Sequence, residues 1–372
     1  MKRYPILEVC ARVEGHEVQH QMLREYCQNF NDWQGLLVRA EREGMAPLLR
    51  KHILESEAEI PATVRRSLSL LYKRHKKQAV VRLKVLEDIL QLFEQHQLTP
   101  ILLKGSALCL TLYPDPALRP MRDMDILFSR AEVDKAQGLL RDAGFEQANS
   151  PIPPDHHHLP ALHKTIDDIK VCFELHRGLY PNCPPYYPVV DFYKLMEAGQ
   201  MIQVGEVDVL TFSHEETLHY LYQHALRAPL TYESYKLINI ADIIGYTEKY
   251  IETLEWQMIQ KRFPLLFNAL PLMQHVSPWN RQNVSEDIIA SVQKERTVDL
   301  ASFNGWPHRR LKDFKANGIG VSKILKETFL PSIWWTQIYY GKTGYRGYLN
   351  AVALKHPRHI LWWKRLYSSL TG

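Results

Sequence analysis

Two carboxylates, Asp123 and Asp125, stand one residue apart at the start of an apolar run that ends at Phe128. Side chains two apart on a strand point to the same face. Two carboxylates held side by side repel each other unless a cation lies between them. The spacing therefore predicts a strand that begins with a divalent-cation site. The alternative is an acid pair on a surface turn.

A second group, Lys104-Gly105-Ser106, follows a short apolar run and opens a helical segment. The free backbone N–H groups at a helix start can receive an anion. Gly105 lets the backbone approach a phosphate closely, and Ser106 offers its hydroxyl and its N–H. Lys104 adds its charge there or points elsewhere, since neighbouring strand residues face opposite ways. An acid pair beside an anion site suits a nucleoside triphosphate with Mg²⁺.

This stretch resembles the nucleotidyltransferase superfamily built on the polymerase-beta fold. The residues that carry the resemblance are Leu103, Gly105, Ser106, Asp123, Asp125 and Ile126. The layout is more similar to a bacterial branch of uncharacterised nucleotidyltransferases. Its recurring motifs are found here as Leu103-Lys104-Gly105, Tyr113 to Arg119, Asp123-Met124-Asp125 and Glu174-Leu175-His176. The spacer between Ser106 and Asp123 is longer than is usual in the wider superfamily.

The resemblance implies transfer of a nucleoside monophosphate from an NTP to an acceptor hydroxyl, with release of pyrophosphate. It implies a two-metal Mg²⁺ site and catalytic residues Asp123, Asp125 and Glu174. Glu174 could also take the proton from the acceptor hydroxyl. Residues expected to bind the nucleotide are Lys104, Gly105, Ser106, Arg119, Arg122 and Lys236, and Asp242 is expected in a supporting role. For the two arginines, neutralising the carboxylates is the alternative.

Residues 170–176 alternate between apolar and polar side chains, which predicts a strand. We expect this strand beside the acid pair, with Glu174 as the third carboxylate. His176 shares the face of Glu174, so it orients that acid, meets the acceptor or is a buried structural histidine. The preceding segment, 150–164, is rich in Pro and His and is expected to be a loop.

Three adjacent histidines, His156, His157 and His158, lie in that loop. They invite a zinc hypothesis, but neighbouring histidines on a loop do not easily converge on one ion. We therefore expect a substrate-facing or solvent-exposed segment there.

The elements around these residues predict an α+β protein: a polymerase-beta-type mixed sheet with helical N-terminal and C-terminal regions. A long amphipathic helix is expected from Thr63 to about Gln97, and Ser213 with Glu216 forms a capping-box pattern. Residues 181–188 predict a linker. The expected regions are 1–97 (helical), 98–180 (nucleotidyltransferase core), 181–296 (helical domain) and 297–372 (basic and aromatic).

The amino-acid composition limits the classes of function that we expect for the protein. A net charge of +5 over 372 residues is mild and aids nucleotide binding, while a dedicated nucleic-acid module is far more basic. Scattered cysteines, the absence of a secretory pattern and the absence of an 18-residue apolar run predict a reduced, cytoplasmic protein.

The segment 342–372 has six Lys or Arg and no acid, and its aromatic residues predict either packing on the helical domain or peripheral membrane contact. The expected partners are an NTP and an acceptor. Small molecules, peptides or proteins and RNA are all possible acceptors, and the mild charge favours a small molecule, peptide or protein. The alternatives to an enzyme are an inactive nucleotide-binding protein and a membrane-peripheral scaffold.

Overall fold

The computed structural model describes residues 4–147, 156–180, 190–227, 236–280, 333–341 and 344–358, with isolated residues at 152, 188, 322 and 329–330. The chain forms two compact units. One comprises Phe30–Thr217 and holds the sheet; the other comprises Met1–Asn29 and Leu218–Gly372 and is helical. The predicted linker at 181–188 lies almost wholly outside the described residues.

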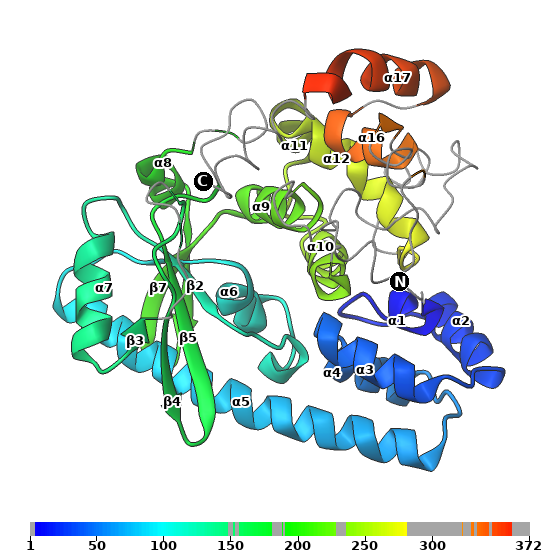
Figure 1. Cartoon of the computed structure of the whole chain (residues 1–372), viewed down its shortest axis with the longest axis horizontal. Helices are drawn as coiled ribbons and strands as arrows, with labels where there is room; N and C mark the ends of the chain where they lie inside the picture. Colours follow the sequence, from blue (N-terminus) through cyan, green and yellow to red (C-terminus); the bar gives the residue numbers. More distant parts are fainter. Residues whose placement is uncertain are drawn as a thin grey trace. The chain divides into compact units, whose positions relative to one another are not determined.

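The sheet unit begins with helices and ends with a β-hairpin (Figure 1). Its helices are α3 (Trp33–Glu43), α4 (Ala46–Glu55), α5 (Ala62–Gln95), α6 (Lys104–Thr111), the 3₁₀ turn η1 (Pro116–Leu118), α7 (Val133–Asp142) and α8 (Phe192–Glu197). Its strands are β1 (Ile101–Leu102), β2 (Met124–Leu127), β3 (Glu146–Gln147), β4 (Leu162–Ile166), β5 (Ile169–His176), β6 (Gln200–Val204) and β7 (Val207–Thr211).

The seven strands form one mixed sheet in the order β3-β4-β5-β2-β1-β7-β6. β2 pairs parallel with β5, β1 pairs parallel with β7, and the remaining neighbours are antiparallel. The predicted α+β class, with a mixed sheet and helices before and after it, is confirmed. The predicted loop over 150–164 is wrong at its end, because Leu162 starts β4.

That error has a local cause. Asp167 and Asp168 both have positive φ, 50° and 62°, and join β4 to β5 as a two-residue hairpin turn. Such turns match the twist of paired strands, so they bring the residues before Ile166 into the sheet. The sheet also continues past residue 180, because β6 and β7 join it. The division into four regions stays a prediction.

The hydrophobic core covers one face of the sheet. Apolar residues of α5 and α7 pack there against Met124 and Ile126 of β2 and Phe173 and Leu175 of β5. Because side chains alternate along a strand, Asp125 and Glu174 point to the opposite face. The long helix was predicted within two residues of its bounds. In Figure 1 its C-terminal half crosses the sheet and its N-terminal half extends beyond it.

The helical unit contains α1 (Pro5–Val9), α2 (Glu17–Gln28), α10 (Leu237–Lys249), α11 (Trp256–Arg262), α12 (Pro264–Ala269), η2 (Leu270–His275), α16 (Ile333–Tyr340), α17 (Gly344–Asn350) and the π-helical segment Ala351–Lys355. α9 (His214–Leu226) runs into this unit from the end of the sheet unit. At its start the Glu216 N–H donates to Ser213 Oγ at 3.4 Å, as the capping-box pattern predicts.

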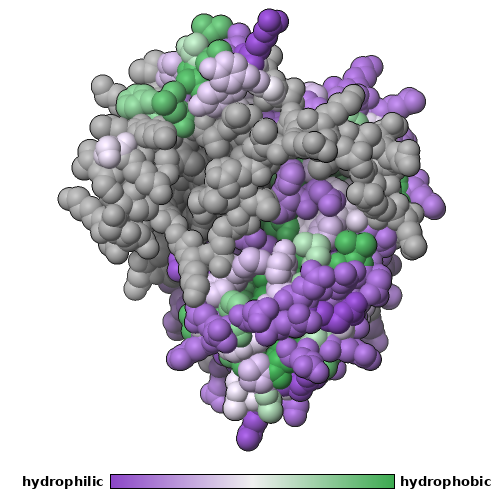
Figure 2. Space-filling model, turned by 90° about the vertical axis from the view of Figure 1, so that its right-hand side faces the viewer, coloured by the Kyte–Doolittle hydropathy of each residue, from purple (hydrophilic) through white to green (hydrophobic). Residues whose placement is uncertain are grey.

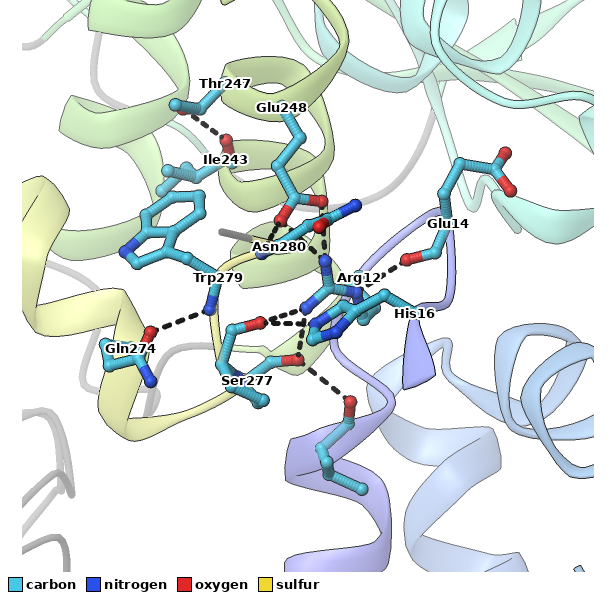
Figure 3. A network of polar contacts seen from close by, with 12 residues as sticks. Arg12, Glu14, His16, Ile243, Thr247, Glu248, Gln274, Ser277, Trp279 and Asn280 are labelled. Carbon is cyan, nitrogen blue, oxygen red and sulfur yellow. Dashed lines mark hydrogen bonds and ion pairs between the residues drawn. The ribbon is translucent and has the colours of Figure 1, made fainter. Parts of the chain in front are cut away.

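A buried ion pair ties the N-terminal segment to α10 within this unit (Figure 3). Arg12 is fully buried and donates to both carboxylate oxygens of Glu248, at 2.6 and 2.7 Å. It also donates to Ser277 Oγ at 3.4 Å and to the Pro278 carbonyl. Burial lowers the pKa of Arg12 and raises that of Glu248, and the pair opposes both shifts. The Glu248 carboxylate therefore depends on Arg12 to stay ionised, and the buried Arg12 charge depends on Glu248 for its compensation.

The C-terminal region is described only in part. Tyr339 and Tyr340 of α16 are buried, whereas Tyr345, Leu349 and Leu354 are exposed. In Figure 2 apolar side chains, in green, gather at the top of the view. This is the height at which α17 lies in Figure 1. Within the described residues no helix has the length and apolarity needed to cross a membrane. The indole rings of Trp306, Trp334, Trp335, Trp362 and Trp363 lie outside the described side chains, and membrane contact by the tail stays a prediction.

Replacing Glu248 by Gln should destabilise the protein by about 3–5 kcal/mol, because it leaves the Arg12 charge buried without its partner. Urea unfolding followed by fluorescence measures the change. The matched control is Glu17→Gln, which breaks the exposed pair with Arg24 and should cost less than about 1 kcal/mol. Equal effects of the two changes would show that the buried pair does not stabilise this unit.

His219 makes stability depend on pH. Its ring stacks on Phe263 at 4.0 Å, and burial lowers its pKa to about 3, compared with about 6.5 in an unfolded chain. Below pH 6.5 the unfolded state takes up a proton that the folded state refuses, so stability falls as pH drops from 6.5 towards 3. His219→Gln should remove up to about 1.4 kcal/mol per pH unit of that slope in this range. Urea unfolding at pH 7 and pH 5 checks it; parallel curves for both proteins would contradict it.

Candidate active site

The site is built where β2 and β5 lie side by side. In their parallel register Asp125 is the partner of Glu174, and Leu127 is the partner of His176. Neighbouring strands are about 4.8 Å apart, so the two carboxylates start from adjacent backbone positions. The potential ligand atoms of Asp125, Glu174 and His176 lie within 4.8 Å of one another. The strand predicted to lie beside the acid pair does so.

Asp125 is almost completely buried, with 4% of its surface exposed. Its Oδ1 accepts from Lys104 Nζ at 3.0 Å and lies 2.8 Å from His176 Nε2. Burial alone would raise the pKa of Asp125, but the Lys104 charge and the His176 hydrogen bond hold it well below its usual range. The carboxylate therefore stays ionised. His176 contacts Asp125 and therefore orients that acid. One of the sequence interpretations had assigned this role of His176 to Glu174.

Glu174 lies in the opposite electrostatic situation. Burial, followed by the negative charges of Asp125 and Asp123, raises its pKa to about 7, and Lys104 only partly opposes this. Buried carboxylates that repel one another are relieved by a cation between them. Asp123 lies outside the group of atoms within 4.8 Å, although its charge acts on Glu174. Two or three carboxylates, one of them oriented by His176, fit a divalent cation that takes oxygen ligands.

The start of α6 faces the same acid. Lys104 has a φ of 45°, in the left-handed region that side chains other than glycine rarely adopt. The fully buried Ser106 accepts at its Oγ from the Asp125 backbone N–H at 3.1 Å, and its own N–H donates to the Leu103 carbonyl at 3.2 Å. A hydroxyl both accepts and donates, so Ser106 keeps an O–H for a further acceptor.

The two flanking arginines are placed differently. A Cβ on Gly105 would lie 3.4 Å from Arg119 Nη1, so the Arg119 guanidinium lies at the start of α6. Arg122 is exposed and donates to the Arg42 carbonyl at 3.3 Å. The helix start therefore has cationic groups from Lys104 and Arg119, and Arg122 lies against the end of α3.

Two predicted residues belong to the helical unit. Lys236 precedes the first residue of α10, and Asp242 is buried within that helix. Their assignment to nucleotide binding and to a supporting role stays a prediction.

The sequence analysis missed Arg82 of α5. Burial lowers the pKa of Arg82, and Asp123 is the first charge that opposes this shift. Its Nη2 donates to the Lys170 carbonyl at 3.3 Å. An arginine on the polar side of a long helix has no distinguishing pattern, so only the packing of α5 against the sheet identifies it.

The three adjacent histidines lie closer together than the sequence analysis led us to expect. The rings of His156, His157 and His158 lie 4.1–5.0 Å apart, centroid to centroid, and their potential ligand atoms lie within 4.8 Å. All three are half-buried and not fully exposed. A β-bridge between His158 and His176 holds the segment against β5. The three rings therefore lie close together, although adjacent histidines on a loop do not easily converge on one ion, and the expectation of a substrate-facing or solvent-exposed segment stays a prediction.

The parallel β2–β5 pair thus places Asp125 and Glu174 side by side, next to a helix start with cationic groups. The model of the uncharacterised nucleotidyltransferase family matches residues 29–266, and the chain belongs to this family. The protein is thus a nucleotidyltransferase, an enzyme that transfers a nucleoside monophosphate.

Two solved structures are similar to the chain. One is the lincosamide antibiotic adenylyltransferase LnuA with lincomycin bound, 18% identical over 44% of this chain and 95% of that chain, with a TM-score of 0.30. The other is an antigenic nucleotidyltransferase-like protein from Paracoccidioides brasiliensis, 15% identical over 55% of this chain and 97% of that chain, with a TM-score of 0.31. No curated protein matches the chain.

Gly105→Ala should weaken nucleotide binding, because its Cβ would lie 3.1 Å from the Met121 side chain, which must shift, and would fill space beside Arg119 Nη1, 3.4 Å away. We expect at least a tenfold rise in the Kd of an NTP, measured by calorimetry. The control is Gly138→Ala on α7, where a Cβ meets nothing within 4 Å. That change should leave the Kd unaltered and stabilise the protein by up to about 1 kcal/mol. Unchanged binding in Gly105→Ala would separate this helix start from the nucleotide.

Proposed function

We propose that the protein is a metal-dependent enzyme that transfers an NMP from an NTP to an acceptor hydroxyl and releases pyrophosphate. The observation that supports this best is the pairing of Asp125 with Glu174 on adjacent parallel strands, on the face opposite the core. Holding two like charges close together away from water costs folding free energy, and such pairs are typical of sites where the carboxylates bind a cation.

In this proposal Asp123, Asp125 and Glu174 hold Mg²⁺. The elevated pKa of Glu174, caused by burial and by the two aspartates, is the mark of a site short of positive charge. When bound, Mg²⁺ would neutralise charge on the triphosphate and on the reacting oxygens.

The residues of the chain would then have four roles. Lys104, whose ammonium contacts Asp125 Oδ1, would exchange this partner for a phosphate oxygen of the NTP. Gly105, Ser106 and Arg119 would bind the triphosphate at the start of α6. Glu174 lies beside Asp125, where it would accept the proton of the acceptor hydroxyl. Arg122 and Lys236 would add positive charge that favours nucleotide binding.

The acceptor in this proposal is a small molecule, peptide or protein. The mild net charge of +5 supports this choice over a polynucleotide, whose binders neutralise many phosphates.

Glu174→Gln should reduce pyrophosphate release at least a thousandfold, because it removes a charged ligand and the base while Asp125 keeps both of its partners. The assay offers each NTP in turn with Mg²⁺ and a panel of hydroxyl acceptors, and detects pyrophosphate. The control is Asp208→Asn, an exposed acid on β7 of the same sheet, which should act as wild type.

Equal turnover of the Glu174→Gln variant and the wild type would contradict the proposed role of Glu174. An NTP that binds with Mg²⁺ but is never turned over, whatever the acceptor, would favour an inactive nucleotide-binding protein.

A further inference from the structure

A cluster of four imidazoles lies beside the acids, and the nucleotidyl transfer proposed above does not use three of them. His156, His157 and His158 are mutually close, and the ring centroids of His157 and His158 lie 5.7 and 5.4 Å from that of His176. Two imidazoles bound to one tetrahedral zinc ion, with Zn–N bonds of about 2.0–2.1 Å, have centroids about 5 Å apart. The observed separations, 4.1–5.7 Å, bracket this value.

Two nitrogens in the cluster lack partners. His157 Nδ1 and His176 Nδ1 are buried and have no hydrogen bond among the described residues. His176 itself is 1% exposed. A buried polar atom without a partner loses its hydration and gains nothing in exchange, so two of them in one cluster of rings point to a missing ligand.

The remaining ring nitrogens are arranged as metal-binding histidines usually are. His158 Nδ1 lies 2.8 Å from the Leu159 carbonyl and donates a hydrogen bond to it, so the Nε2 atom of His158 carries the lone pair that can bind a metal. His176 Nε2 lies 2.8 Å from Asp125 Oδ1, so its Nδ1 is the free one. Metal-bound histidines generally donate their second N–H to a carbonyl or a carboxylate, which fixes the tautomer and the ring orientation. His156 Nδ1 lies 3.5 Å from the His158 N–H, at the long limit of a hydrogen bond, so either of its nitrogens can serve.

We propose that His156, His157 and His158 bind one first-row transition-metal ion of the zinc class, with His176 Nδ1 or water as the fourth ligand. This site is distinct from the carboxylate site, because its donors are nitrogens. Imidazole suits Zn²⁺, Co²⁺ and Ni²⁺, whereas Mg²⁺ takes oxygen ligands. The segment and β5 would be joined by the metal as well as by the His158–His176 bridge, and a fixed positive charge would lie one ring away from Asp125.

The test is a calorimetric titration of the full chain with ZnCl₂ in the presence of excess MgCl₂, with a parallel thermal unfolding series. We expect one Zn²⁺ per chain and a raised unfolding midpoint. Zn²⁺ that bound the unfolded chain equally well would not raise this midpoint, so the shift reports a site formed by the fold. Co²⁺ should give the intense visible absorption of a tetrahedral nitrogen site.

Variants locate the site. His156→Gln, His157→Gln and His158→Gln should each weaken Zn²⁺ binding at least tenfold and abolish the thermal shift. His96→Gln at the end of α5 is the matched control, and it and Glu174→Gln should keep both. Circular dichroism checks that each variant folds. If the His157 variant does not, the His156 and His158 variants still test the site.

Two results would overturn the proposal. One is wild-type protein that binds no Zn²⁺ in excess Mg²⁺ or shows no thermal shift. The other is Zn²⁺ binding that is lost in Glu174→Gln and kept in the three histidine variants, which would place the ion at the carboxylates.

Discussion

The structure of the site depends on one pairing, that of β2 with β5 in parallel register. This pairing places Asp125 next to Glu174 on a face that the protein buries. Negative charges in such a place must be compensated, and Lys104 and His176 both contact the same oxygen of Asp125. Within the described part of the chain Glu174 forms no ion pair. Burial and repulsion by Asp125 and Asp123 raise its pKa to about 7, and the Lys104 charge only partly opposes this. The site therefore holds one acid whose charge is compensated, Asp125, and one whose charge is compensated only in part, Glu174.

The rest of the sheet unit supports this arrangement. Because β2 and β5 alternate, their apolar residues enter the core formed with α5 and α7, and their acids face the other way. The hydrophobic core therefore fixes which side chains reach the site. α6 adds Ser106, whose hydroxyl accepts the backbone N–H of Asp125, so the helix start and the acid strand are held together by a buried hydrogen bond.

Sequence reasoning found the parts of this site that have a local pattern. Alternation from Lys170 to His176 identified β5 and the face of Glu174, and the Asp-x-Asp spacing identified β2. It failed where the pattern depends on partners far away in the chain. β6 and β7 are five residues each and pair with each other around Gly205, which has a positive φ. β7 then pairs with β1, which is only two residues long and therefore too short to show alternating apolar and polar side chains.

The histidine segment shows the same limit. Three adjacent rings converge because a β-bridge to His176 and hydrogen bonds from Arg177 and Gly178 to the His157 carbonyl set the local backbone. These contacts link residues about 20 apart, so spacing alone does not reveal them. The left-handed φ of Lys104, which accompanies its contact with Asp125, is equally invisible in the sequence.

The central claim is that Asp125 and Glu174 share a divalent cation with a bound triphosphate. A crystal structure with Mn²⁺ and a non-hydrolysable NTP analogue, with anomalous data at the manganese edge, tests it most directly. The account predicts an anomalous peak about 2.1–2.2 Å from a carboxylate oxygen of each residue, with the Lys104 ammonium moved onto phosphate. A nucleotide bound with no peak between these two carboxylates, and Lys104 still on Asp125, would contradict it.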